Sequence, residues 1–323
     1  MRAPVPFSFD YSIPFLRWAL QSPDQYAEWL VGIRVKQTRK LVAFISATPG
    51  NLIVHSKSVK LPEINFLCVH KKLRSKRLAP ILIKEITRRI NVDAFITGTS
   101  IQGAIYTTGI RLPLPVAQCW YWHRALNTKK LIETGFYPLT PRMTMSRTIK
   151  LYALPEETRT RGLRPIRESD HETCCEQLNA FLKTFLIAPQ LSVAEFRHWM
   201  GGRPDVIYTY VVEDPDTLNI TDMVSFYSLP STVLSSSKHG TLYAANCFYY
   251  FNAKTPLNAL MHDALILAKR HNFDVFTTLD FLHNETFIKD LKFVTGEDGA
   301  LRYHLFNWRS PFVKPEEVGL ILL

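Results

Sequence analysis

The sequence predicts an α/β protein in which mixed sheets are flanked by helices and one structural pattern is used twice. Two apolar, β-rich hairpins of like design predict the repeat: residues 29–35 with 41–46, and residues 206–212 with 223–228. In each half an amphipathic helix and a buried strand come after the hairpin. A chain of 323 residues is long enough to bury two such units.

The helices of the two halves are predicted by apolar stripes at helical spacing. The first stripe is Leu78, Ile81, Leu82, Ile86 and Ile90, and the second is Leu257, Leu260, Met261, Ala264, Leu265 and Ala268. Buried strands are predicted at residues 104–107 and 274–279. Each half then has an Asn followed nine residues later by Phe, which marks a short second helix before a further strand-like segment.

Hairpin, helix, strand, helix and strand is the order of the acyl-CoA N-acyltransferase fold of the GNAT type. We therefore predict a tandem duplicated GNAT-like fold. The periodicity breaks between residues 151 and 162, around Pro155, so the predicted halves are residues 1–155 and 156–323.

The amino-acid composition limits the partners and the kinds of site that we expect. The formal net charge of +11 predicts an anionic partner, and nucleic acid, an acidic membrane surface and a phosphate-rich cofactor all fit. No apolar run reaches the roughly 18 residues needed to cross a bilayer, and Asp10 and Arg17 interrupt any signal-like core. Five cysteines without a CxxC pair argue against a disulfide framework or a zinc site. We expect a cytoplasmic protein.

The most informative stretch is a buried strand at residues 63–69, then a basic turn, then a helix with Pro80 in its first turn. A helix start offers unpaired N–H groups and a partial positive charge, which bind phosphate. Arg74, Ser75, Lys76 and Arg77 lie at that point. Taken alone, such a run is more often a solvated face, or else a nuclear-import or nucleic-acid patch. The strand, turn and helix around it favour phosphate.

This stretch makes the sequence similar to a known family. The residues Glu-Ile-Asn-Phe-Leu-Cys-Val-His-Lys at 63–71 match the signature of the N-myristoyltransferases at every position, and Leu-Arg-Ser-Lys-Arg at 73–77 matches the adjoining segment of that family. The resemblance continues collinearly through residues 121–124 and 225–231 to the terminal Gly-Leu-Ile-Leu-Leu at 319–323. The chain is identified as a member of that family.

The resemblance implies transfer of a myristoyl group from myristoyl-CoA, as co-substrate, to the α-amine of an N-terminal glycine, with no metal and no acyl-enzyme. It implies an oxyanion hole made by the backbone N–H groups of Phe66 and Leu67, and it places Asn65 and Thr107 near the reacting amine. Two fixed donors suit charge that grows on the thioester oxygen. The implied clamp for the phosphates of CoA consists of Arg74, Ser75, Lys76, Arg77, Leu78, Ala79 and Pro80. The halves are then expected to bind myristoyl-CoA and the peptide, respectively.

The implied general base is the terminal carboxylate of Leu323. An α-carboxyl titrates near ~3.5 and an α-amine near ~8, so the transfer in water is uphill by about 6 kcal/mol. Burial among the apolar residues 318–323 would raise the pKa of the carboxyl and lower this barrier. A tail packed as a C-terminal edge strand is compatible with that role.

The implied peptide groove contains Tyr121, His123, Tyr227, Asp298 and Gly299. Without the family, His123 is interpreted as an ordinary packed histidine. The implied partners are the N-terminal glycine peptides of nascent or newly cleaved proteins, and an association with the ribosome is also expected. A thiol nucleophile at Cys68 with His70, and a metal site at residues 280–285, are both disfavoured.

The sequence departs from the family in three places. The resemblance begins at residues 7–11, after the family's acyl-CoA cover and acidic loop. Residues 91–103 are longer than the family's connection, and the glycine-rich turn at 296–299 has one residue more. Loss of the family's opening strand and helices is expected to expose apolar surface and leave a sheet edge unpaired. These departures keep open a catalytically impaired acyl-CoA or acyl-peptide binding protein. A nucleic-acid binder that uses the +11 charge is a third, weaker hypothesis, because the sequence offers no reader helix or zinc finger.

Overall fold

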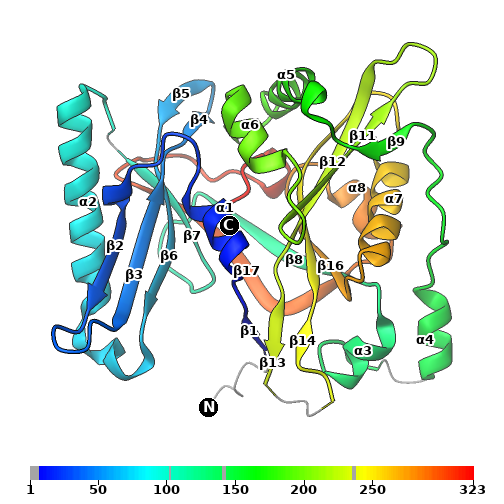
Figure 1. Ribbon diagram of the computed structural model, residues 1–323, viewed down its shortest axis with the longest axis horizontal. Coiled ribbons are helices and arrows are strands. Elements are labelled where there is room, and N and C mark those ends of the chain that lie inside the picture. The colour runs from blue at the N-terminus through cyan, green and yellow to red at the C-terminus, as the bar shows by residue number, and fades with distance from the viewer. Residues whose placement is uncertain (1–6, 102, 140–142, 235–237) are drawn as a thin grey trace.

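The computed structural model describes residues 7–101, 103–139, 143–234 and 238–323. These form a mixed α/β structure around an 11-stranded sheet, with two 3-stranded sheets beside it. Figure 1 shows the sheet in two wings, with β2, β3 and β6 on the left and β11 and β12 on the right. The order of strands in the large sheet is β2-β3-β6-β7-β17-β8-β16-β15-β12-β11-β9. The predicted fold class, mixed sheets flanked by helices, is confirmed.

The elements of the first half agree with the predicted pattern. They are β1 (Phe7–Phe9), α1 (Ile13–Leu20), β2 (Leu30–Arg34), β3 (Leu41–Thr48), β4 (Asn51–Val54), β5 (Lys57–Lys60), β6 (Glu63–Val69), α2 (Leu78–Thr97), β7 (Ala104–Thr108), β8 (Ala117–Ala125), α3 (Thr128–Glu133) and α4 (Met145–Leu151). Short 3-10 helices lie at Ala27–Trp29 (η1) and Lys71–Lys76 (η2).

The second half repeats the order. Its elements are β9 (Leu163–Pro165), α5 (His171–Leu182), β10 (Ile187–Pro189), α6 (Val193–Met200), β11 (Ile207–Glu213), β12 (Ile220–Ser228), β13 (Ser231–Val233), β14 (Thr241–Leu242), β15 (Ala244–Asn252), α7 (Leu257–Arg270), β16 (Val275–Leu279), α8 (Glu285–Ile288) and β17 (Val294–Phe306). Two 3-10 helices, η3 (Glu168–Asp170) and η4 (Pro315–Glu317), complete it.

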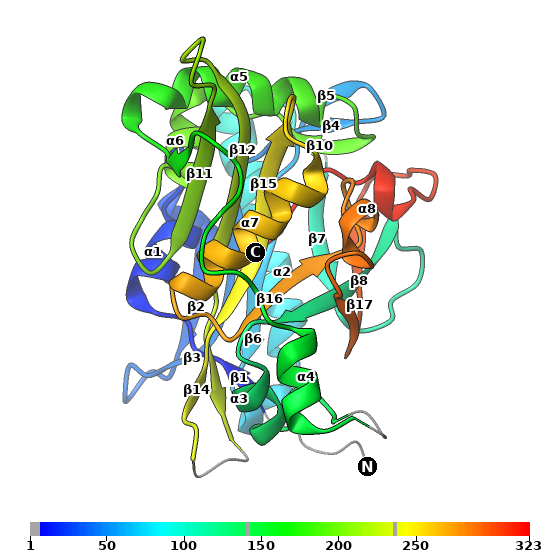
Figure 2. The same cartoon turned by 90° about the vertical axis from the view of Figure 1, so that its right-hand side faces the viewer.

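Strand pairing shows the repeat directly. In the first half β2, β3 and β6 pair antiparallel, and after α2 the strand β7 pairs parallel with β6. In the second half β11, β12 and β15 pair antiparallel, and after α7 the strand β16 pairs parallel with β15. The helix α2 lies along the first wing and α7 along the second (Figures 1 and 2).

The last strand of each half pairs with the other half. Strand β17 pairs with β7, β8 pairs with β16, and β8 and β17 pair with each other at the centre of the sheet. The predicted division between residues 155 and 156 falls in the connection between α4 and β9, and it stays a prediction. The crossing strands mean that the two wings share one hydrogen-bonded sheet.

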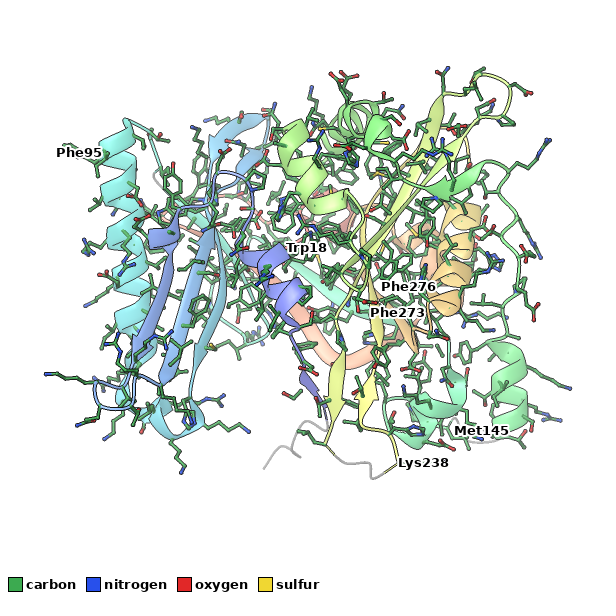
Figure 3. The ribbon with its side chains drawn as sticks, in the orientation of Figure 1. Trp18, Phe95, Met145, Lys238, Phe273 and Phe276 are labelled. Atoms are coloured by element: carbon green, nitrogen blue, oxygen red, sulfur yellow. The ribbon has the colours of Figure 1, made fainter. Side chains whose placement is uncertain are left out.

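The helix α1 fastens the N-terminal segment to the second wing. Trp18 is fully buried, and its indole Nε1 donates to the main-chain oxygen of His198 at 3.1 Å. Its ring packs against Trp199, Tyr227 and Phe248 at centroid distances of 5.2, 5.8 and 5.7 Å (Figure 3). A buried tryptophan with a satisfied N–H contributes a large apolar area to the core.

The longer connection at residues 91–103 extends α2 to Thr97, where Gly98 ends the helix in a left-handed conformation with φ of 65°. The side chain of Phe95 is 89% exposed and points away from the sheet (Figure 3). Residues 91–97 therefore belong to the end of α2 that lies far from the basic turn. Strands β2 and β9 are the edge strands of the large sheet.

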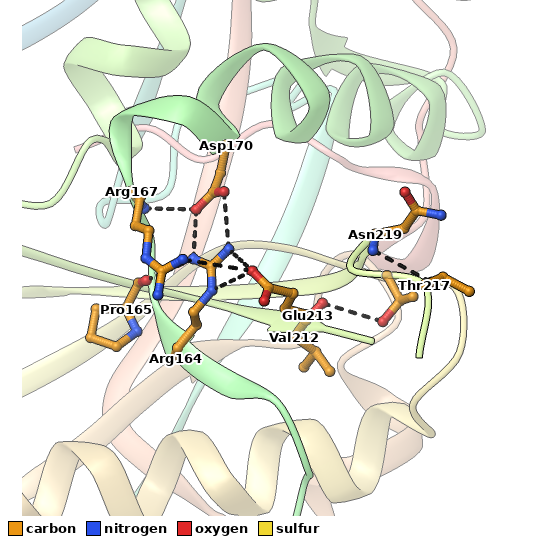
Figure 4. A network of polar contacts seen from close by, with 9 residues as sticks. Arg164, Pro165, Arg167, Asp170, Val212, Glu213, Thr217 and Asn219 are labelled. Atoms are coloured by element: carbon orange, nitrogen blue, oxygen red, sulfur yellow. Dashed lines mark hydrogen bonds and ion pairs between the residues drawn. The ribbon is translucent and has the colours of Figure 1, made fainter. Parts of the chain in front are cut away.

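A partly buried ion-pair network opens the second half (Figure 4). The guanidinium of Arg164 donates to both carboxylate oxygens of Asp170, at 2.7 and 3.0 Å, and its Nε donates to Glu213 at 2.8 Å. Just before it, Gly162 has φ of 76°, and its carbonyl accepts from Glu213 N at 3.0 Å. A Cβ at Gly162 would lie 1.9 Å from the carbonyl oxygen of Glu213, so only glycine fits this approach.

We expect Gly162→Ala to lower the free energy of unfolding by more than about 1 kcal/mol, because it adds a backbone clash and strain at a positive φ. Urea unfolding followed by circular dichroism measures the change. Gly240→Ala is the matched control, since a Cβ there meets nothing within 4 Å and its φ is not positive. Equal effects of the two substitutions would contradict the prediction.

Candidate active site

A β-bulge in β6 creates the irregular backbone at the centre of the predicted site. Strand β3 pairs Ser46 with Asn65 and Phe44 with Cys68, so β6 has one extra residue between these pairs. Phe66 has φ of 56°, a left-handed conformation that is rare for a bulky side chain. Phe66 and Leu67 therefore have no partner residues in the β3 ladder. Their backbone N–H groups are the pair that the family resemblance assigns to the oxyanion hole.

Strand β6 also separates from β7. The two strands pair in parallel only at Glu63 with Ile105 and Ile64 with Tyr106. Beyond Ile64 they diverge, and a cavity of about 1120 Å³ lies between β6, β7 and α2. Ligand pockets usually measure about 300–1,000 Å³, so this one is large enough for a long chain. Seven isoleucines give it an apolar wall: Ile45, Ile64, Ile83, Ile86, Ile90, Ile101 and Ile110.

The cavity brings together all five residues predicted to be catalytic. Asn65, Phe66, Leu67, Thr107 and Leu323 all line it, although Leu323 is more than 200 residues away from the others in sequence. The side-chain amide of Asn65 is oriented so that its nitrogen faces hydrogen-bond acceptors. In this orientation the nitrogen donates to a main-chain oxygen of Leu323 at 3.3 Å. The Oγ of Ser46 holds the backbone of Asn65 by donating to its carbonyl at 3.1 Å. The structure thus places the chain end beside the bulge.

Buried hydrogen bonds hold the C-terminal tail. The hydroxyl of Tyr249 accepts from Ile321 N at 3.0 Å, and the hydroxyl of Tyr303 donates to the carbonyl of Leu320 at 2.8 Å. Gly319 N donates to Ile187 O at 2.7 Å, and a Cβ on Gly319 would lie 2.9 Å from the ring of Phe185. The tail is buried, but it contributes only one isolated bridge, at Val318, and does not form an edge strand.

The predicted phosphate clamp lies at the start of α2. Arg74, Ser75 and Lys76 are exposed in η2, and Arg77 adopts a left-handed conformation that turns the chain into α2. No side chain caps this helix start, so its first N–H groups remain open to a ligand. Pro80 lies in the first turn, as predicted. The seven clamp residues do not line the cavity, whose α2 wall begins at Ile83.

The predicted peptide residues gather on the central strands and the second wing, and they do not line the large cavity. Tyr121 and His123 project from β8 with parallel rings 6.5 Å apart. His123 is buried, and its Nδ1 lies 2.9 Å from the hydroxyl oxygen of Thr277, a geometry that a packed histidine would also have. Tyr227 is buried, and burial, followed by the nearby Tyr121, raises its pKa.

The glycine-rich turn forms a wide bulge in β17. Thr295 pairs with Trp122 and Ala300 pairs with Trp120, so residues 296–299 lie opposite Tyr121 alone. Gly299 has φ of 83°. The side chain of Asp298 lies outside the described residues.

Two residues of the disfavoured metal site at residues 280–285 make other contacts. Asp280 accepts from Trp120 N at 2.7 Å, and His283 packs against the rings of Phe181 and Phe185. Within the described parts of the chain, no group of three His, Cys, Asp or Glu side chains could hold a metal ion. In the same parts, no helix combines the length and the apolarity needed to span a bilayer.

Sequence reasoning missed two residues at the site. The ring of Tyr11 meets that of Phe66 edge-on at 5.6 Å. Glu63, the first residue of β6, is the other. Burial, with a smaller contribution from Glu195, raises the pKa of Glu63 to about 8. A carboxylate at the start of a largely apolar strand was the available signal.

Comparison with known proteins now decides the family. The sequence matches the family description "Myristoyl-CoA:protein N-myristoyltransferase, N-terminal domain" over residues 4–119 and the corresponding C-terminal domain over residues 133–321. This chain belongs to the N-myristoyltransferase family. That family is one of acyltransferases.

Relatives among N-myristoyltransferases are similar over nearly the whole chain. Glycylpeptide N-tetradecanoyltransferase 1 of Arabidopsis thaliana is 49% identical over 98% of this chain and 72% of its own length. Glycylpeptide N-tetradecanoyltransferase 2 of Bos taurus is 50% identical over 98% of this chain and 62% of its own length, less than two thirds. A crystal structure of Saccharomyces cerevisiae N-myristoyltransferase with bound myristoyl-CoA has a TM-score of 0.93 at 41% identity, and it covers 98% of this chain and 82% of that one.

We expect Glu63→Gln to change the pH dependence of stability. The pKa of Glu63 is about 8 in the folded chain and near ~4.3 when unfolded, so the wild type loses stability as pH rises from about 4.5 to 8. A glutamine has no such loss. The free energy of unfolding of the variant, relative to wild type, should therefore increase over that range by up to about 5 kcal/mol and then level off.

Urea unfolding at pH 5, 7 and 9 measures this difference. Glu172→Gln, at an exposed position of α5, is the control, and its difference from wild type should stay constant. A constant difference for Glu63→Gln as well would show that the carboxyl is not held protonated.

Proposed function

We propose that this chain transfers a myristoyl group from myristoyl-CoA to the α-amine of an N-terminal glycine on a protein. The observation that carries the proposal is the meeting of Phe66, Leu67, Asn65, Thr107 and Leu323 at one large apolar cavity. An apolar cavity suits a fatty acyl chain. A backbone bulge and a chain terminus at its wall suit chemistry on a thioester.

In the proposed reaction the backbone N–H groups of Phe66 and Leu67 bind the thioester oxygen as negative charge develops on it. Donors fixed by the strand need no reorganisation at the moment of reaction, and a single such donor commonly contributes a factor of about 10²–10³ in kcat. The amine attacks the thioester carbon directly, the tetrahedral centre collapses, and the thiolate of CoA leaves. No covalent bond to the enzyme forms.

The terminal carboxylate of Leu323 accepts a proton from the glycine ammonium in this scheme. Asn65 orients the carboxylate through the contact of 3.3 Å. Thr107, on β7, faces the same cavity and offers a hydroxyl near the amine. The surrounding apolar walls weaken solvation of the ammonium, which favours loss of its proton.

The exposed cations before α2 would bind the phosphates of CoA outside the cavity mouth. Arg74, Lys76 and Arg77 supply charge, and the uncapped start of α2 supplies N–H donors. The pantetheine arm would then run along β6 toward the bulge. The positive net charge of the chain supports an anionic co-substrate.

A binding protein without turnover is the second candidate, and one observation favours it. Tyr121, His123 and Tyr227, proposed for the peptide, lie outside the large cavity, and two of the three are buried. A peptide would need to reach the thioester past these packed side chains. The two candidates predict the same acyl-CoA binding and different turnover. The expected ribosome association stays a prediction.

Purified chain incubated with myristoyl-CoA and a peptide beginning Gly-x-x-x-Ser tests both candidates. Release of free thiol together with acylated peptide is expected. A peptide with an acetylated amine should give neither, because no nucleophile is left. Binding of myristoyl-CoA without thiol release would replace the enzyme by the second candidate.

We expect that adding one alanine after Leu323 lowers kcat at least about a hundredfold, in the range of general-base contributions, because the carboxylate moves away from Asn65. Binding of myristoyl-CoA, measured by calorimetry, should stay within about twofold. Leu323→Ile, which keeps the carboxylate in place, is the matched control. Full activity of the extended chain would remove the carboxylate from the mechanism.

We expect Arg74→Ala combined with Lys76→Ala to weaken binding of myristoyl-CoA by at least tenfold, because two cations at the phosphate site are lost. Lys84→Ala is the control, an exposed cation further along α2. Raising the salt concentration should weaken the wild type more than the double variant. An unchanged Kd in the double variant would move the phosphates elsewhere.

A further inference from the structure

A second, much smaller cavity adjoins the chain end. Its volume is about 40 Å³, and Asn65 and Leu323 line it as well as the large cavity. A cavity needs roughly 10–15 Å³ for each water, so two or three waters fit. Its other polar side chains include Glu63 and Glu195. The small cavity is therefore lined both by the terminal residue and by two residues with carboxyl side chains.

Glu63 is placed to hold a proton rather than a counter-ion. It begins β6 opposite Thr48, and no ion pair or hydrogen bond to its carboxyl is found among the described residues. No Lys, Arg or His lines the small cavity. The groups that face it are the carboxyl of Glu195 from α6, the hydroxyl of Tyr249 from β15, and the chain end at Leu323. An unpaired carboxyl in such surroundings favours its protonated form.

The proposed reaction must dispose of one proton. An ammonium and a thioester give an amide, a thiol and one free proton, so one proton goes to the sulfur of CoA and another leaves the site. Leu323 can accept this proton but is a poor place for it to remain, because an α-carboxyl normally titrates near ~3.5. The terminal carboxylate must also be free again before the next turnover.

We propose that Glu63 takes this proton from Leu323 through water in the small cavity and passes it to solvent. The inference rests on the proposed function. The step is balanced: the Leu323 carboxyl loses one proton, the Glu63 carboxylate gains it, and the waters between them exchange protons without net change. In this scheme Glu63 does not contact the amine or the thioester. It acts through Leu323, and its role is to determine where the released proton goes.

The electrostatics of Glu63 suit this role. Burial, and then the charge of Glu195, raises the pKa of Glu63 to about 8, close to the ~8 of an α-amine. A proton that moves from the amine to Glu63 by way of Leu323 ends at nearly equal free energy. With a pKa of about 8 Glu63 is mostly protonated near neutral pH, and its capacity to accept protons rises as the pH approaches that value.

Steady-state kinetics of the full chain from pH 6 to 10, with myristoyl-CoA and the glycine peptide, test the proposal. We expect Glu63→Gln to lower kcat at pH 8 by at least tenfold, to flatten its rise with pH and to leave both KM values within about twofold. Glu63→Asp, which retains a carboxyl, should restore part of kcat. Glu195→Gln should shift the rise to lower pH, because it removes a charge that raises the pKa of Glu63. Glu172→Gln should change neither.

The variants Glu63→Gln and Glu195→Gln distinguish a proton relay through Glu63 from a merely structural role of Glu63. A damaged fold would lower kcat without moving the midpoint of the pH profile, whereas Glu195→Gln should move it while the peptide amine is unchanged. If Glu63→Gln keeps the wild-type kcat and pH profile, the relay is wrong. If Glu195→Gln leaves the midpoint in place, Glu63 is not the titrating group and the relay is equally wrong.

An infrared titration distinguishes failure of the relay from failure of the proposed function. Should the wild type acylate no peptide, the relay still requires a protonated carboxyl that titrates near pH 8 and vanishes in Glu63→Gln. It also requires that this titration shifts when one residue is added after Leu323, since the two groups share a cavity. Absence of either signal would overturn the coupling between Glu63 and the chain end.

Discussion

The site depends on how β6 leaves its neighbours. A strand inside a sheet has its N–H groups occupied on both sides, so it has none to offer a substrate. Here the bulge at Phe66 breaks the ladder to β3, and the pairing with β7 ends at Ile64. The same divergence opens the cavity and puts the unpaired residues Phe66 and Leu67 at its wall. The left-handed φ of Phe66 is the local strain that accompanies this arrangement.

The second constraint is the crossing of β8 and β17 at the centre of the sheet. Each strand comes from one half and pairs with the other, so the wings cannot slide past each other without breaking hydrogen bonds. This matters because the bulge belongs to the first half and the chain end to the second. A contact of 3.3 Å between Asn65 and Leu323 requires that both wings be placed accurately.

Much of the fold could be predicted from the sequence, because its elements carry strong periodicity. The hairpins, α2 and α7, and the strands β7 and β16 lie close to their predicted positions. Pairing between the halves could not be predicted, since periodicity says nothing about which strand lies beside which. The residues of the candidate site could be predicted from the family signature, but their electrostatics could not. In the sequence Glu63 is an ordinary first residue of a strand, and only its burial in the structure shows that its pKa is raised. The long connection after Asn91 also gave no sign that it would continue the helix to Thr97.

The proposed base on the last residue of the chain is an unusual one, because chain ends usually fray. In the structure the second half restrains the tail through the hydroxyls of Tyr249 and Tyr303 and the close approach of Gly319 to Phe185, and the first half adds the contact of Asn65 with Leu323. Tyr249 also lines the small cavity with Glu63. The side chain that fixes the tail is thus beside the water-sized space into which the proton would go. Position and proton transfer would then be controlled at the same place, which explains why a terminal carboxylate can serve where an ordinary side chain would have been simpler.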